Sequence, residues 1–530
     1  MKIPHKIAAI SGLTALSCAL PCAVNAQEIP TGFNTAVPSE IMTPDKVETK
    51  YLGTLEFSDG RPSKETADKI FDQLAYLRAV EVFLNWMPAC SIEAMRMAHV
   101  SVGITKPNQV WLTEQLLDSN PLFLTGNTDT VYASAILDLE RDGPTVVAIP
   151  PNCGPGTVND AFFRFVVDIG MPGPDRGQGG KYLILPPDYE SLSIEFNDNN
   201  SFTSITVGSV TEDYYVVQSP SYTNWLILRG FLVDGKPDTA VKMFKEGLKI
   251  YPLKDSANPP NMEFKNLSEA VVNTIHANNE KFYEELNHVI QKEPIGLVDP
   301  ELRGLAASIG IEKGEPFKPD ARMKAILKDA AVVGNATARS ISLASRDPEI
   351  LMYPDSQWKT AFVGGDYRWL RNGGKGGRHQ DARSLFFYLA TVNTPAMAMK
   401  FIGAGSQYAW NERDSKGRYL DGDKNYKLNI PKDVPAKDFW SVVIYDPQTR
   451  SQLQTEQPLP SRNNTMADFV MNDDGSVDLY FGPRAPEGKE ENWIQTVPGK
   501  GWFTIIRLYG PLEPWFDKTW QPGEIELLEN

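Results

Sequence analysis

The sequence predicts an α+β protein of several domains, in which two antiparallel β-rich domains, resembling sandwiches or jelly rolls, flank a helical segment. Three observations predict this fold class. Short alternating or β-branched segments, separated by Pro, Gly and Asn turns, fill residues 121–236 and return within 347–530. Residues 237–346, between them, carry apolar residues at helical spacing. The strand segments follow one another without the helices that parallel βαβ units require, which favours antiparallel pairing.

Residues 1–26 have the pattern of a secretory signal peptide. Two lysines form a basic start, and an apolar stretch at 7–20 follows that is too short to span a bilayer. Val24-Asn25-Ala26 then supplies small residues at positions −3 and −1. We therefore expect cleavage after Ala26 and a periplasmic or secreted protein. No later segment reaches 18 uninterrupted apolar residues, so we expect no transmembrane anchor.

Residues 27–120 are predicted to form an irregular lead-in, to about residue 60, followed by helix. Ser63 suits a helix N-cap, and apolar residues then recur at helical spacing to about Met97. Pro88 lies inside this pattern, where its missing amide and its ring should break the helix.

The remaining elements follow from the same two periodicities. The strands expected in 121–236 are 131–139, 145–149, 162–169, 181–185, 203–207, 214–217 and 225–233. The helices expected in 237–346 are 238–249, 267–291, 300–309 and 319–344. The strands expected in 347–530 are 408–409, 425–428, 440–445, 468–471, 477–481 and 503–508. Trp440 has alternating apolar neighbours, which predicts a core position.

The formal net charge of −15 excludes some classes of partner. An acidic surface repels phosphate backbones and anionic lipids, so we expect neither nucleic acid nor a membrane surface. A small molecule or a saccharide is the expected ligand. The sequence leaves open whether the chain forms a homo-oligomer.

Established catalytic motifs are absent from the sequence. There is no HExxH, no Cys/His pair at zinc-ligand spacing, no GxSxG elbow and no phosphate-binding loop. His276 and His288 fall in a helical region that we expect to be exposed to solvent. We therefore predict neither a transition-metal site nor a nucleotide cofactor.

Two acidic segments resemble weak calcium sites. Asp421-Gly422-Asp423 and residues 472–475 (NDDG) offer the carboxylate and carbonyl oxygens that hard cations prefer. Neither completes an EF-hand loop, and both fall where hairpin turns are expected. We interpret them as Asp-Gly turns and keep calcium as the weaker alternative.

Cys90 and Cys153 remain after removal of the expected signal peptide. An oxidising compartment would permit a disulfide between them, whereas two separate buried thiols are the alternative. Nothing local in the sequence brings the two cysteines together.

The densest polar segment is residues 127–132 (NTDTVY). If a strand begins at residue 131, Thr130 and Tyr132 share one face, and Asn127 and Asp129 line the preceding turn. Asn and Asp at such a turn often bond only to their own backbone. We nevertheless list all four as candidate ligand-binding residues.

Arg164 and Asp168 complete the candidate site. They lie four residues apart on the predicted strand 162–169 and therefore share a face, as a structural ion pair or as part of a polar site. If Arg164 approaches Asp129, its charge would hold that carboxylate ionised. No catalytic residue can be assigned.

These residues belong to stretches that resemble two bacterial families. Residues 126–134 (GNTDTVYAS), residues 225–235 with Arg229, and residues 251–253 (YPL) resemble the domain of unknown function 1254. Further stretches resemble the domain of unknown function 1214, namely 421–422, 438–446 (DFWSVVIYD), 474–475, 492–493 and 507–509 (RLY). The resemblance implies an N-terminal β-rich domain, a helical middle and a C-terminal jelly-roll-like sandwich. It implies no catalytic mechanism.

Two functions fit the sequence. The first is recognition of a small molecule or saccharide-like ligand in a polar site between the β-rich domains, because ligand sites often form at domain interfaces. The alternative is a carboxylate-based hydrolase of a neutral or cationic extracellular substrate, using acids such as Asp129 and Asp168. Whether the protein is an enzyme stays open.

Overall fold

The computed structural model describes residues 37–190, 201–207 and 209–529, so the predicted signal peptide and its cleavage site lie outside the described residues. The chain divides into two compact units, with the boundary in the sequence between Leu74 and Ala75. The described part of the first unit contains an antiparallel sheet of β1 (Lys46–Thr49), β2 (Gly53–Ser58) and β3 (Arg61–Pro62). The prediction of an irregular lead-in missed this sheet, because its strands alternate half-buried and exposed residues over only a few positions.

Helix α1 (Lys64–Ser101) is capped as predicted but is not broken. The Ser63 hydroxyl accepts a hydrogen bond of 3.2 Å from the Thr66 amide. The helix continues through Pro88, so the predicted break there is wrong. The residues around Pro88 are almost fully buried, from Trp86 to Cys90, and their tertiary packing supports the turn that lacks a hydrogen bond.

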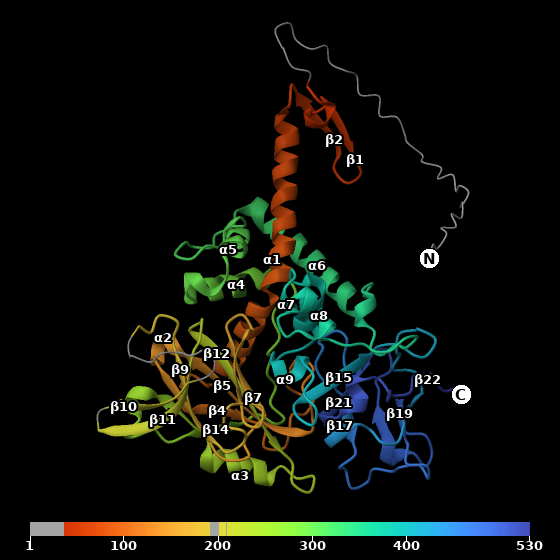
Figure 1. Ribbon diagram of the computed structural model, residues 1–530. Helices are drawn as coiled ribbons and strands as arrows, with labels where there is room; N and C mark the ends of the chain where they lie inside the picture. Colours follow the sequence, from red (N-terminus) through yellow and green to blue (C-terminus); the bar gives the residue numbers. More distant parts are fainter. Residues whose placement is uncertain (1–36, 191–200, 208, 530) are drawn as a thin grey trace, which may run out of the picture. The chain divides into compact units, whose positions relative to one another are not determined.

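The N-terminal β-rich region consists of two packed sheets (Figure 1). Along β5 (Thr130–Asp138), Val131, Ala133 and Ala135 enter the core between the sheets, whereas Tyr132 packs against the core that contains α1. The first sheet has the order β14 (Glu263–Asn266), β4 (Gln109–Leu112), β5, β12 (Thr223–Phe231), β7 (Gly156–Asp160) and β8 (Phe165–Ile169). The second has the order β10 (Ser201–Val207), β11 (Val210–Gln218), β9 (Gly180–Leu185), β6 (Thr145–Ile149) and β13 (Lys249–Pro252).

The C-terminal β-rich region repeats this two-sheet arrangement. Along β17 (Ala436–Tyr445), Trp440, Val442 and Ile444 face the core between the sheets, which confirms the predicted position of Trp440. The intervening Ser441, Val443 and Tyr445 face the other way. One sheet has the order β15 (Ser406–Asn411), β21 (Phe503–Pro511), β17 and β18 (Ser461–Asn463). The other has the order β20 (Trp493–Gln495), β19 (Val477–Gly482), β16 (Tyr426–Ile430) and β22 (Ile525–Leu527).

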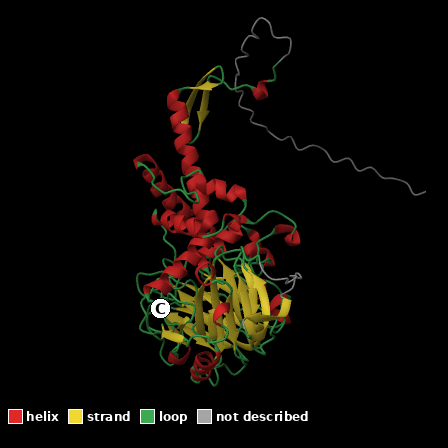
Figure 2. Cartoon of the chain, turned by 90° about the vertical axis from the view of Figure 1, so that its left-hand side faces the viewer, coloured by secondary structure: helices red, strands yellow, loops and turns green. Residues whose placement is uncertain are grey.

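The chain is therefore an α+β protein with two β-rich regions and a helical segment between them. Most neighbouring strands are antiparallel, as predicted, but β9–β11, β4–β14 and β19–β20 are parallel. Figure 2 shows most helices gathered at one end of the strands. The jelly-roll topology and the predicted domain boundaries stay predictions.

Most of the central helices form near their predicted ranges. They are α3 (Asp238–Gly247), α4 (Lys281–Lys292), α5 (Pro300–Ala307) and α6 (Ala321–Leu343). Helix α4 begins fourteen residues later than the predicted start at 267, because residues 267–275 instead run beside the N-terminal sheet through backbone hydrogen bonds at Leu112 and Leu122.

Sequence periodicity missed helix α8 (Gln380–Leu389) in the C-terminal half. From Ala382 to Leu389 every residue is buried, so this part of the helix has no solvent-exposed face, and its apolar residues follow one another directly at 385–389 instead of recurring at helical spacing. Shorter helices are α2 (Leu139–Asp142), α7 (Arg371–Gly374), α9 (Pro395–Ala398) and α10 (Glu513–Phe516). The predicted strand at 468–471 is absent there, since those residues form turn and irregular structure.

Two further findings concern the cysteines and the helices. Cys90 and Cys153 are free thiols, and both are buried. The alternative of two separate thiols is therefore the one that the structure shows.

Among the described helices, none combines the length and apolar character needed to span a membrane.

Candidate functional site

Asn127 builds the turn that precedes β5. Its Oδ1 accepts hydrogen bonds from the amides of Asp129 (2.9 Å) and Thr130 (3.1 Å) and from the Thr130 hydroxyl (3.1 Å). Its Nδ2 donates to the Tyr132 hydroxyl at 2.6 Å. Asn127 and Thr130 are fully buried. These two side chains therefore shape the turn, as in the turn-forming alternative, and leave Asp129 to point away from it.

The carboxylate of Asp129 reaches across to the C-terminal region. Ser441 on β17 donates to Oδ2 at 2.5 Å, and Asn463 on β18 donates to Oδ1 at 3.1 Å. Burial raises the pKa of Asp129 above its ordinary value, against these hydrogen bonds and the nearby charge of Arg507. Asp129 therefore joins the two β-rich regions rather than capping its own turn.

Arg164 does not belong to this cluster. Its Nε donates to the buried carboxylate of Asp160 at 2.6 Å, and its side chain is 44% exposed. Because Arg164 precedes β8 instead of lying within it, the predicted shared face with Asp168 does not form. The predicted ion pair of Arg164 with Asp129 or Asp168 is wrong, because its guanidinium instead pairs with Asp160, four residues earlier in the chain.

Asp168 lies in a separate environment on β8. The Thr394 hydroxyl donates to its Oδ2 at 2.9 Å, whereas its buried Oδ1 has no hydrogen-bond partner. Burial raises the pKa of Asp168 to about 6, although the Thr394 hydroxyl opposes the shift. Asp168 therefore accepts a proton more readily than an exposed aspartate.

Each β-rich region contributes one buried arginine to the same cavity. Arg229 lies on β12 beside Tyr132 of β5, and Arg507 lies on β21 between Tyr408 of β15 and Ser441 of β17. Their exposed fractions are 8% and 4%. Among the described residues, no carboxylate forms an ion pair with either guanidinium. This arrangement is unusual, because a buried charge is costly without a counter-charge.

The protein contacts of both arginines are neutral. Arg507 Nη2 donates to the Thr125 carbonyl and to the Tyr445 hydroxyl, and its buried Nε has no partner. Arg229 Nη1 makes a long hydrogen bond of 3.4 Å to the Ser406 hydroxyl. Both guanidiniums therefore keep N–H groups available for a further acceptor.

Phenol side chains surround the two guanidiniums. The hydroxyls of Tyr408 and Tyr509 are buried and have no hydrogen-bond partner. Burial opposes the ionisation of Tyr408, but Arg229 and Arg507 outweigh it and hold the pKa of Tyr408 below its ordinary value. The environment thus favours negative charge beside the arginines.

A cavity of about 50 Å³ lies between the two β-rich regions and is lined by both arginines, together with Tyr132 and Tyr408. Phe123, Phe362, Phe386 and Trp410 contribute apolar walls. A second cavity of about 30 Å³ shares Arg229 with the first and is also lined by Asp168 and Thr394. Arg229 therefore separates a cationic, phenol-lined space from one that contains a carboxyl group.

Of the candidate site residues, Tyr132 and Asp168 line cavities, but two different ones, and Arg229, Tyr408 and Arg507 were not among the candidates. Arg229 and Arg507 do fall within the stretches that carry the family resemblance. That resemblance was the available signal, because strand periodicity does not show which polar residues meet across two regions.

One group of side chains has the spacing of metal ligands. Ligand atoms of Asp347, Glu349 and His379 lie within 4.8 Å of one another. However, His379 Nδ1 accepts a hydrogen bond from the Ala382 amide, which leaves the proton on Nε2, where it faces Asp347. The geometry therefore matches a helix cap supported by a carboxylate, and a metal would have to displace the proton from Nε2.

The two acidic segments considered for calcium act in turns. Asp421 Oδ1 accepts from the Asp423 amide, and Asp474 Oδ1 accepts from the amide and hydroxyl of Ser476. His276, expected in a solvent-exposed helix, is 2% exposed and precedes α4, so that expectation is wrong. His288, on α4, is half-exposed and contacts Glu93.

The comparisons with known families agree with this arrangement of two regions. Residues 107–252 match the family described as protein of unknown function DUF1254, and residues 405–513 match the family described as protein of unknown function DUF1214. The chain contains a DUF1254 domain followed by a DUF1214 domain. Arg229 falls in the first domain and Arg507 in the second, so the cavity that both line is formed by residues of both domains.

Two solved structures are similar to the chain. The VPA0106 protein of Vibrio parahaemolyticus is 18% identical, with a TM-score of 0.48, over 85% of this chain and 100% of that one. A putative uncharacterized protein from Burkholderia cenocepacia is 12% identical, with a TM-score of 0.38, over 88% of this chain and 97% of that one. No curated protein matches the sequence significantly.

Proposed function

We propose that this protein binds a small molecule carrying an anionic group, a carboxylate or a phosphate, between its DUF1254 and DUF1214 domains. The observation that carries the proposal is the pair Arg229 and Arg507. Both guanidiniums line one cavity, and no described carboxylate pairs with either. A bound anion would give the two guanidiniums a direct ion-pair partner, and arginine is well suited to planar oxyanions.

The size of the cavity matches the charged end of such a ligand. A water needs roughly 10–15 Å³ of such space, so about 50 Å³ accommodates a carboxylate or a phosphate. The aromatic walls of Phe123, Phe362 and Phe386 suit an apolar or ring-shaped remainder. A saccharide-like ligand fits this chemistry best when it carries an acidic group.

The alternative of a carboxylate-based hydrolase lacks a specific observation in its favour. Glycoside cleavage requires two acids on either side of the scissile bond. The Asp129 carboxylate is occupied by Ser441 and Asn463, and Asp168 lines the neighbouring cavity. The proposal is therefore one of binding, and it includes no catalytic step.

We also propose that the protein is exported from the cytoplasm. Residues 1–26 would direct the chain out of the cytoplasm, and the mature protein would begin at Gln27 in the periplasm or outside the cell. N-terminal sequencing of protein exported by a bacterial host tests this. An N-terminus at Met1 on the exported protein would contradict it.

The binding proposal is tested by calorimetric titration with sodium acetate, sodium benzoate and inorganic phosphate. We expect saturable binding of at least one anion, weakened about tenfold or more in Arg229→Gln, because a charge-assisted hydrogen bond contributes roughly 1.5–3 kcal/mol. Tyr408→Phe, which removes a cavity hydroxyl beside Arg229, should weaken binding with little loss of stability, because that hydroxyl makes no hydrogen bond of regular geometry within the protein.

Arg450→Gln provides the matched control. Arg450 is also buried, but it donates to the backbone carbonyls of Tyr388 and Gln448 and does not line the cavity. Its replacement should lower stability and leave anion affinity unchanged. Absence of binding by all three anions, or equal affinity of the wild type and Arg229→Gln, would contradict the proposal.

A further inference from the structure

The largest of the cavities described lies in the helical segment, away from the paired arginines. Its volume is about 300 Å³. It is enclosed by α1, the end of α4, the turn at Ile295–Leu297, α5 and residues 311–313. This volume reaches the range of ligand sites, which begins at roughly 300 Å³.

The walls of this cavity are mainly apolar. Trp86, Leu297 and Ile311 are nearly fully buried, and Ile290 lies beside them. Ile295, at the edge, is 62% exposed. Ile295 therefore marks an edge at which the cavity reaches the solvent.

Two cations lie at the same cavity without a carboxylate partner. Among the described residues, Arg303 and Lys313 form no ion pair. Arg303 donates to the Ile295 carbonyl, and Lys313 donates to the carbonyls of Gln291 and Glu293. Because their partners are neutral, an anionic group of a ligand would gain from both charges.

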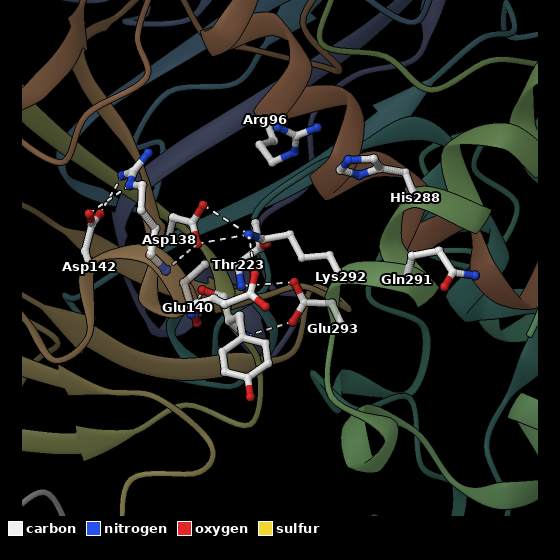
Figure 3. A network of polar contacts seen from close by, with 12 residues as sticks. Arg96, Asp138, Glu140, Asp142, Thr223, His288, Gln291, Lys292 and Glu293 are labelled. Atoms are coloured by element: carbon white, nitrogen blue, oxygen red, sulfur yellow. Dashed lines mark hydrogen bonds and ion pairs between the residues drawn. The ribbon is translucent and has the colours of Figure 1, made fainter. Parts of the chain in front are cut away.

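Two glutamates, Glu293 and Glu312, also line this cavity, and they differ in whether other protein groups bind their carboxylates. The carboxylate of Glu293 accepts hydrogen bonds from the amides of Tyr222 and Thr223, at 2.7 and 3.0 Å (Figure 3). Next to it, Lys292 contacts Asp138 and Glu140, so this network attaches the end of α4 to the N-terminal sheet. Glu293 is therefore engaged with the protein, whereas Glu312 is exposed to solvent.

Helix α5 leaves space at the cavity. Gly304 lines it, and a Cβ added to Gly304 would meet no atom within 4 Å. Ala307 lines it one turn later. Large side chains at these two positions are therefore suitable for filling the cavity, and neither position has a left-handed backbone conformation.

We propose that this cavity binds a medium-chain carboxylic acid, with its chain against Trp86 and Leu297 and its carboxylate at Arg303 and Lys313. A water needs roughly 10–15 Å³ of such space, and a methylene group is of similar size, so about 300 Å³ has room for roughly twenty such groups. A chain of about ten such groups therefore fits within the cavity. This site is independent of the proposed anion site between the domains.

Calorimetric titration of the full chain with sodium decanoate tests the proposal. We expect one saturable site, lost in the filling variant Gly304→Phe/Ala307→Phe and retained in the control Gly304→Ala. Replacing both cations, in Arg303→Met/Lys313→Met, should weaken decanoate about tenfold. The same replacement should leave the affinity for 1-decanol nearly unchanged, because the alcohol carries no charge.

Thermal unfolding of each variant, followed by circular dichroism, establishes that it is folded. Arg229→Gln separates the two sites, since decanoate held between the domains would lose affinity in that variant. No heat of binding in the wild type, or undiminished binding in the filling variant, would overturn the proposal. Loss of decanoate binding in Arg229→Gln but not in the filling variant would assign the acid to the inter-domain site and also overturn it.

Discussion

Ser441 donates a hydrogen bond of 2.5 Å to Oδ2 of Asp129, although 312 residues separate the two along the chain. Ser441, on β17, also lies directly opposite Arg507 on the neighbouring strand β21. One serine thus connects the Asn127 turn of the first β-rich region to the strand that carries a cavity arginine of the second. The relative position of the two domains is coupled through this contact to the geometry of the proposed anion site.

The first prediction concerns this contact. Ser441→Ala and Asp129→Ala should each lower the free energy of unfolding by about 1–3 kcal/mol, because each leaves a buried polar partner unsatisfied. The double variant should lose less than the sum of the two, since both changes remove the same interaction. Urea denaturation of the four proteins measures this coupling. Strictly additive losses would mean that Ser441 and Asp129 do not stabilise each other.

The second prediction concerns pH. The pKa of Asp168 is raised from 3.8 to about 6, so the folded protein retains this proton where the unfolded chain releases it. Stability should therefore fall as pH rises from about 4 to 6, by on the order of 2 kcal/mol. Asp168→Asn should remove this loss, because its amide is neutral and still accepts from Thr394. The measurement is the stability difference between wild type and Asp168→Asn at pH 4.5 and pH 7. A difference that does not grow with pH would refute the assignment.

The third prediction compares two helical glycines. A Cβ at Gly334 on α6 would lie 2.7 Å from the buried ring of Phe83, whereas a Cβ at Gly304 would meet no atom within 4 Å. Gly304→Ala should stabilise the protein by about 0.5–1 kcal/mol through helix propensity. Gly334→Ala should destabilise it by about 1–3 kcal/mol, because overpacking outweighs the same gain. Thermal melts of both variants provide the comparison, and changes of equal sign would contradict it.

The fourth prediction concerns the thiols. Cys90 and Cys153 are free and buried, and burial raises the pKa of both. Protein beginning at Gln27 should not react with Ellman's reagent while folded, because the thiolate is disfavoured and shielded. In guanidinium chloride the unfolded protein should release two equivalents of thionitrobenzoate per chain, one for each thiol. Fast reaction in the folded state, or a mobility change on non-reducing gels, would argue against two protected free thiols.

Local patterns predicted a large part of the fold. Strand β6 (Thr145–Ile149) coincides with its predicted range, and α5 and α6 begin within two residues of theirs. Alternation and helical spacing are properties of neighbouring residues, so they are readable from the sequence. Helix α8 was not readable, because its apolar residues follow one another directly instead of recurring at helical spacing.

The candidate site divides in the same way. The sequence by itself determined that Asn127, Asp129, Thr130 and Tyr132 form a dense polar turn entering a strand. Only the tertiary structure decided that Asp129 bonds to Ser441, that Arg164 bonds to Asp160, and that Arg229 and Arg507 line one cavity. The physical reason is that a side chain's direction depends on local backbone geometry, whereas its partners depend on which distant strands pack against it. A side chain forms hydrogen bonds and ion pairs only with groups a few ångströms away in space, and those groups can be hundreds of residues away in the sequence.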